Sequence, residues 1–103
     1  MSDAGTGAPC ADAWAVYLLE CADGRVYTGI ARDPEQRYVK HLAGKGARFT
    51  RSNPPRQLLG WVWVAGHSEA LRLEIAWKRL PRTARIAALH AGMPQAPLCT
   101  MPP

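Results

Sequence analysis

Five side chains in this sequence are of types that could together hydrolyse a phosphate ester. They are two tyrosines, an arginine, a histidine and a glutamate: Tyr17, Tyr27, Arg37, His41 and Glu74. Such a reaction needs a deprotonated water, positive charge beside the phosphate and help for the leaving oxygen, and a divalent metal can supply several of these. Each side chain could also have an ordinary structural role. The functional interpretation requires that the elements carrying the five residues bring them together.

The two tyrosines lie on stretches that the sequence predicts to be the strands of a hairpin. Residues 14–20 and 25–31 are rich in β-branched and aromatic side chains, and Asp23-Gly24 between them is a hairpin turn signal. Hairpin strands lie side by side, so Tyr17 and Tyr27 can stand near each other. The alternative role of both is plain packing, with the hydroxyls at the edge of the sheet.

Arg37 and His41 are expected on a helix that runs from Pro34 to about Leu42. Asp33 is a good N-cap, and proline is favoured at the first helical position. Residues four apart share a helix face, so the guanidinium and the imidazole point the same way. Alternatively, Arg37 pairs with Asp33, and His41 is a cation that favours the helix C-terminus.

Glu74 is the candidate metal ligand, on a second helix predicted from Ser68, as its cap, to about Leu80. A core stripe runs along that helix at Leu73, Trp77 and Leu80, and Glu74 lies beside it. Magnesium is commonly held by one or two carboxylates together with waters and substrate phosphate. The alternative is an exposed pair with Lys78 at i+4, worth about 0.3–0.5 kcal/mol.

The remaining pattern predicts an α+β domain: a small three-stranded antiparallel sheet flanked by helices. A long loop is expected over residues 43–57, a third strand over 58–65 and a short last helix over 83–91. The chain of 103 residues then divides into a disordered leader (1–13), one domain (14–91) and a Pro-rich flexible tail (92–103).

Positive charge is concentrated in one part of the chain. Between Arg25 and Arg56 there are eight basic residues against two acidic ones, although the whole chain carries only +5. Such a stripe suits a polyanion, although it could also be a solvated surface. The expected nucleic-acid contacts are Lys40, Lys45, Arg48 and Arg51. Phe49, among them, could stack a base or anchor the loop to the core.

Several classes of protein are disfavoured by composition. No segment approaches the roughly 20 apolar residues of a membrane span, and the first residues lack the features of a secretory signal, so a cytoplasmic protein is expected. The three cysteines, Cys10, Cys21 and Cys99, show no CxxC spacing. They argue against both a disulfide framework and a zinc site.

The ordered set Ala15-Val16-Tyr17, Tyr27-Thr28-Gly29, Arg37, His41 and Glu74 resembles the GIY-YIG nuclease domain. The segments VKHLAGKGARFT and EALRLEIAWKRL look like its small stand-alone bacterial members, and the resemblance covers roughly residues 14–89. Two departures are visible: AVY replaces GIY, and YTG replaces YIG. Both keep the tyrosine and change only small or apolar neighbours.

This resemblance implies a role for each residue. Glu74 would bind Mg²⁺ or Mn²⁺, Arg37 would stabilise the transition state, and one tyrosine would activate or orient the water. His41 would carry a proton or contact phosphate. The implied protein is a metal-dependent endonuclease-like phosphodiesterase acting on DNA, with branched or single-stranded forms among its candidate substrates. A monomer is expected.

Little sequence specificity is expected, because the chain shows no separate recognition domain. The alternative function is a non-catalytic nucleic-acid-binding module on the same fold. A small scaffold that binds another protein through exposed aromatic residues is a third hypothesis.

Overall fold

The computed structural model describes residues 11–92 of the chain. Its elements are β1 (Trp14–Cys21), β2 (Val26–Ala31), α1 (Pro34–Leu42), α2 (Arg48–Ser52), β3 (Pro55–Val64), α3 (His67–Lys78) and α4 (Arg82–Gly92). The strands form one three-stranded antiparallel sheet in the order β2-β1-β3, so β1 is central. The predicted α+β fold is confirmed. Most of the predicted leader and tail lies outside the described residues, although Ala13 is buried.

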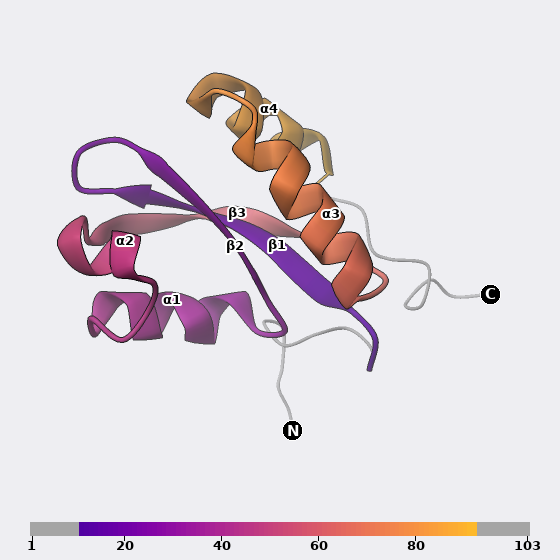
Figure 1. Ribbon diagram of the computed structural model, residues 1–103, viewed down its shortest axis with the longest axis horizontal. Helices are drawn as coiled ribbons and strands as arrows, with labels where there is room; N and C mark the ends of the chain where they lie inside the picture. Colours follow the sequence, from indigo (N-terminus) through magenta and orange to yellow (C-terminus); the bar gives the residue numbers. More distant parts are fainter. Residues whose placement is uncertain (1–10, 93–103) are drawn as a thin grey trace.

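Alternation along β1 sends its side chains to opposite faces of the sheet. Val16 and Leu18 belong to the larger core, with Trp77 of α3. Tyr17 belongs to a smaller cluster on the other face, against which Tyr38 of α1 packs. Helices α3 and α4 cover one face, and α1 and α2 lie on the other (Figure 1). Tyr17 therefore faces the helix that carries two of the other predicted site residues.

The β1–β2 hairpin closes at the predicted Asp23-Gly24 turn. Gly24 has a φ of 90°, in the left-handed region that glycine tolerates. Its N–H donates to the carbonyl of Cys21 over 2.9 Å. The resulting register places Tyr17 opposite Gly29.

The segment expected as one loop over residues 43–57 is not a loop throughout. It contains helix α2, and β3 begins already at Pro55, which pairs with Cys21 of β1. Proline is tolerated at the first position of a strand, and the carbonyl of Pro54 accepts from the N–H of Ala22 over 2.8 Å. The five residues of α2 carry no side-chain N-cap, so the sequence has no start signal there.

The later helices agree with the prediction except at one cap. Helix α3 begins at His67, and Gly66 occupies the N-cap position without a side-chain hydrogen bond, so the predicted cap at Ser68 is wrong. The carbonyl of Gly66 accepts the first helical bond, from Ala70, over 3.0 Å. Helix α4 is tied to the sheet by Arg85, whose Nη1 donates to the carbonyl of Val26 over 2.8 Å.

Cys21 is buried at the end of β1, as expected of a small apolar side chain. Cys10 and Cys99 lie outside the described residues. Over residues 11–92, no helix is long and apolar enough to cross a bilayer.

Candidate active site

The predicted site residues line one hollow of about 360 Å³. Tyr17 comes from β1, Tyr27 from β2, Arg37 and His41 from α1, and Glu74 from α3. Strand β2 is an edge strand, and α1 and α3 belong to opposite helical layers. The hollow therefore joins the two layers at the β2 side of the sheet, and it gathers side chains that the sequence keeps far apart.

A chain of three hydrogen bonds runs behind the hollow. The phenol of Tyr17 lies 3.0 Å from Nε2 of His41, and Nδ1 of His41 lies 2.6 Å from Oγ1 of Thr50. The Thr50 hydroxyl donates to the carbonyl of Ala47 over 2.9 Å. A hydroxyl has only one proton to donate, so Oγ1 must accept from Nδ1–H. In the neutral imidazole Nε2 is then unprotonated, and it accepts the proton of Tyr17.

Burial favours the uncharged forms of the side chains in this series of hydrogen bonds. His41 and Thr50 are 2% and 1% exposed. Burial, and next the charge of Arg37, lower the pKa of His41 below its ordinary 6.5. Burial, and next Tyr27, raise the pKa of the Tyr17 phenol well above its ordinary range, against a lowering by Arg37. At neutral pH the imidazole is neutral and the phenol keeps its proton.

Two glycines leave the room that this arrangement needs. A Cβ at Gly29 would collide with the hydroxyl of Tyr17, and a Cβ at Gly46 would collide with Nδ1 of His41. Neither glycine has a positive φ, so the requirement is for space and not for an unusual backbone conformation.

Tyr27 is held by a stack of aromatic rings. Its ring lies 5.3 Å from that of His41 and 5.9 Å from that of Phe49, nearly parallel to the latter at 17°. The guanidinium of Arg25 lies 5.0 Å from the centre of the Phe49 ring. Of the two roles considered for Phe49, these contacts favour anchoring. Burial raises the pKa of Tyr27 as well.

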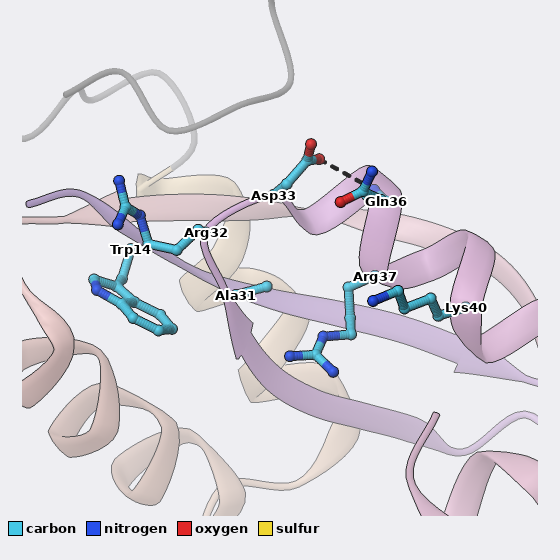
Figure 2. A pocket seen from close by; sticks show the side chains of 7 residues that line it. All are labelled: Trp14, Ala31, Arg32, Asp33, Gln36, Arg37 and Lys40. Atoms are coloured by element: carbon cyan, nitrogen blue, oxygen red, sulfur yellow. Dashed lines mark hydrogen bonds between the residues drawn. The ribbon is translucent and has the colours of Figure 1, made fainter. Parts of the chain in front are cut away.

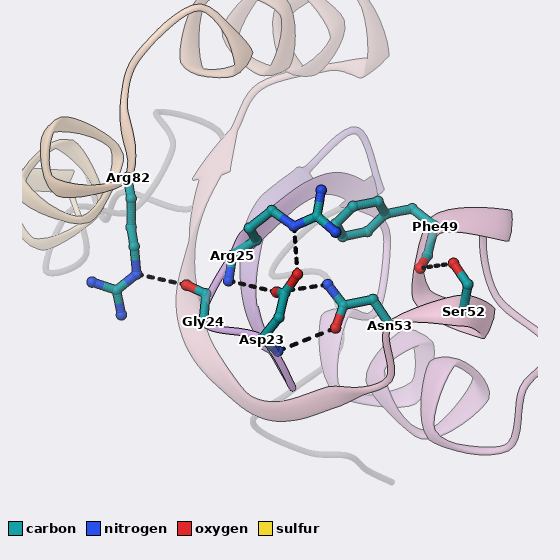
Figure 3. A network of polar contacts seen from close by, with 7 residues as sticks. All are labelled: Asp23, Gly24, Arg25, Phe49, Ser52, Asn53 and Arg82. Atoms are coloured by element: carbon teal, nitrogen blue, oxygen red, sulfur yellow. Dashed lines mark hydrogen bonds and ion pairs between the residues drawn. The ribbon is translucent and has the colours of Figure 1, made fainter.

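Helix α2, which carries Thr50, is fixed to the β1–β2 hairpin by a polar network (Figure 3). Nδ2 of Asn53 donates to the Asp23 carboxylate over 2.8 Å, and the N–H of Asp23 donates back to Oδ1 of Asn53 over 3.2 Å. The backbone N–H of Arg25, Asn53 and then the Arg25 side chain lower the pKa of Asp23 to about 2. The carboxylate therefore stays ionised, and α2 stays tied to the hairpin.

Arg37 is exposed at the mouth of the hollow. The alternative pair with Asp33 is absent from the ion pairs of residues 11–92. Asp33 instead accepts from the N–H of Gln36 over 3.1 Å, which confirms its predicted role as N-cap. The guanidinium is thus available to a ligand in the hollow.

Glu74 is the carboxylate that lines the hollow, and it is partly engaged. Its Oε2 lies 3.2 Å from Nζ of Lys78, the pair foreseen as the alternative role, and its side chain is 17% exposed. Within the described part of the chain, no group of three or more histidine, cysteine or acidic residues could hold a metal. A single carboxylate beside a hollow with room for waters and a phosphate suits Mg²⁺ or Mn²⁺, with Lys78 as the competitor.

The expected nucleic-acid contacts are distributed around this hollow. Lys45 lines it, and Lys40 lines a neighbouring hollow that shares Arg37. Arg48 and Arg51 are exposed on α2 and line neither.

Thr50 is the site residue that the sequence did not reveal. It lies in a short helix that has no start signal, and threonine nine residues after histidine is not a motif. Its signal is the burial of a hydroxyl next to an imidazole, which only the folded structure shows.

Comparison with known proteins shows the family of the chain. The family model described as the GIY-YIG catalytic domain matches residues 13–87. A UPF0213 protein of Cupriavidus pinatubonensis is 49% identical over 74 residues, which are 72% of this chain and 82% of that protein. One of Xanthomonas axonopodis pv. citri is 47% identical over 78 residues, 76% of each chain. The solution NMR structure of a UPF0213 protein from Bacillus halodurans is 38% identical, covers 74% of this chain and 81% of its own, and has a TM-score of 0.46.

Proposed function

Because the chain belongs to the GIY-YIG family, whose catalytic domain is that of nucleases, we propose that it is a metal-dependent endonuclease that hydrolyses phosphodiester bonds of DNA. One observation carries the proposal: the Tyr17–His41 hydrogen bond ends at the same hollow that Arg37 and Glu74 line. A proton acceptor, a phosphate-binding cation and a metal-binding carboxylate then meet at one place.

His41 is the final acceptor of the proton in this mechanism. A water in the hollow gives a proton to the phenolic oxygen of Tyr17, while the phenolic proton moves to Nε2 of His41. The resulting hydroxide attacks phosphorus, and the bond to the leaving oxygen breaks with its electron pair on that oxygen. The leaving oxygen takes a proton from solvent, and His41 returns its own to solvent. Tyr17 never carries a lasting negative charge, as its raised pKa requires.

Charge on the phosphate is met from the side of α1. The planar guanidinium of Arg37 can hold two phosphate oxygens at once, and Lys45 adds a second cation at the same hollow. When it is bound at Glu74, the divalent metal supplies Lewis-acid stabilisation of the developing charge.

Contacts of this kind read the backbone and not the bases, so we propose little sequence specificity and a preference set by DNA shape. Branched and single-stranded DNA are the first substrates to test. We further propose that the protein acts in the cytoplasm as a monomer.

A cleavage assay tests the function directly. Duplex, branched and single-stranded DNA are incubated with the protein and Mg²⁺ or Mn²⁺, with EDTA as the parallel control. We expect cleavage that EDTA abolishes and that a separately purified His41→Ala variant lacks. Equal cleavage by wild type and variant would mean that the activity is a contaminant or arises elsewhere.

The ion pair between Glu74 and Lys78 favours a second candidate, a module that binds nucleic acid without cleaving it. In that case the pair persists at 3.2 Å, and the carboxylate stays unavailable to the metal. Salt-dependent DNA binding together with no metal-dependent cleavage would select this function.

A further inference from the structure

A second hollow adjoins the candidate active site and shares one residue with it. It measures about 210 Å³ and lies between the start of β1 and the first turns of α1. Arg37 lines both hollows. The guanidinium of Arg37 can therefore contact a group bound in either hollow.

The wall of this second hollow is strongly basic. Three cations, Arg32, Arg37 and Lys40, line it together with one carboxylate, that of Asp33. That carboxylate caps α1 by accepting the N–H of Gln36 (Figure 2). Figure 2 shows Arg37 and Lys40 on one side of the hollow and Arg32 on the other.

Trp14 closes the hollow on the side of Arg32. The Arg32 guanidinium lies 5.9 Å from the centre of the Trp14 ring, and the edge-on His67 ring packs against the same indole at 4.5 Å. The indole is only partly buried. An apolar wall beside three cations fits a nucleotide unit, which has a charged phosphate and an apolar face.

We propose that this hollow binds the phosphate next to the scissile one on the same nucleic-acid strand, with Arg32 and Lys40 on that phosphate and Arg37 between the two. The inference rests on the proposed function, because it takes the first hollow as the place of the scissile phosphate. It assigns Arg32 and Trp14 to substrate binding, and it gives the strand a path from the active site along α1 towards β1.

The test uses binding without cleavage, so that it stands apart from catalysis. A fluorescent single-stranded oligonucleotide is titrated in EDTA over a range of salt concentrations. In the Arg32→Gln/Lys40→Gln variant, we expect the slope of log affinity against log salt to fall by about 0.7 for each phosphate charge that is no longer neutralised. Arg72→Gln, an exposed arginine of α3 that lines neither hollow, should keep the wild-type slope.

NMR then locates the effect. The oligonucleotide should shift the indole N–H of Trp14 in the wild type, and this shift should be lost in the double variant while the amide of Gly46 still responds. An unchanged slope, or an equal fall with Arg72→Gln, would overturn the second phosphate site and leave the proposed function standing. Failure of the wild type to bind any oligonucleotide would reject both.

Discussion

The phenolic oxygen of Tyr17 lies 3.0 Å from Nε2 of His41, and the other imidazole nitrogen is already committed to Thr50. The last hydrogen bond sets the direction of the other two, because the Thr50 hydroxyl donates its one proton to the carbonyl of Ala47. The tautomer of the histidine is therefore set from outside the hollow. Thr50, which does not line the hollow, thus sets which nitrogen of His41 can accept a proton.

Thr50→Val should disturb this arrangement while keeping the side-chain shape. Without the hydroxyl, Nδ1–H loses its buried acceptor, and the competing tautomer places a proton on Nε2. General acid–base catalysis contributes about 10²–10⁴ in rate, and we expect a partial loss, on the order of 10–10², in single-turnover cleavage. Nitrogen NMR shifts of His41 report the tautomer directly.

Thr50→Ser is the matched control, because it restores the hydroxyl in the same place. It should recover most of the rate and the wild-type tautomer. If valine and serine variants lose activity equally, Thr50 acts through packing alone.

The pH dependence of cleavage should follow His41. Only the neutral imidazole can accept a proton, and the pKa of His41 lies below 6.5 because of burial and Arg37. The single-turnover rate should therefore rise with pH on the acid side of 6.5 and stay level through neutrality, since Tyr17 keeps its proton there. A profile that rises only in the alkaline range would make the tyrosine the titrating base.

Stability should depend on the same proton. The folded state depresses the pKa of His41, so the unfolded chain binds more protons between the folded pKa and 6.5. The stability that the neutral histidine provides is present above pH 6.5 and is lost as pH falls through the folded pKa. Urea unfolding at pH 7.5 and 5 should show a larger loss for wild type than for His41→Gln.

Glu74→Gln should abolish metal-dependent cleavage and leave DNA binding in EDTA nearly unchanged. Glu69→Gln on the same helix is the control, since Glu69 is exposed, pairs with Arg72 and does not line the hollow.

Removing Lys78, which competes with the metal for Glu74, should have the opposite effect. Lys78→Ala frees the carboxylate, so half-maximal cleavage should need less Mg²⁺ than in wild type; an unchanged requirement would exclude Glu74 as the ligand.

Arg37→Lys separates charge from geometry. The lysine keeps the charge but loses the planar fork that holds two oxygens. If Arg37 meets the phosphate in the transition state, the single-turnover rate should fall by about 10²–10³ with much less change in affinity. A rate near that of the wild type would mean that Arg37 contributes only its charge at the surface and does not contact the phosphate in the transition state.

Replacing Lys45, Arg48 and Arg51 together with alanine should weaken binding to all DNA sequences alike. Phosphate contacts carry no sequence information, and the salt slope on duplex DNA should fall by about 0.9 for each phosphate that these side chains neutralise in the wild type. Reduced affinity for some sequences only would mean that these residues read bases.

Strand alternation, a turn glycine and a capped helix are local signals, so the sequence predicts the hairpin, α1 and most of β3, although β3 begins at Pro55 and not at residue 58. The residues around the hollow were indicated by these elements together with the family resemblance. Tyr17, Arg37 and His41 each lie on an element whose start and period can be read directly. Helix α2 could not be predicted, since it has no cap and is held by long-range contacts such as Asn53 with Asp23. Thr50 was missed for the same reason.

The position of α3 in the chain has a consequence during synthesis. The ribosome releases the N-terminal part first, so the residues up to Thr50 emerge before the strand β3 and the helix that carries Glu74. A nascent chain can thus hold both tyrosines and the histidine without Glu74, the carboxylate that we propose as the metal ligand. Under the proposed function, the order of synthesis therefore delays a complete site until α3 has emerged.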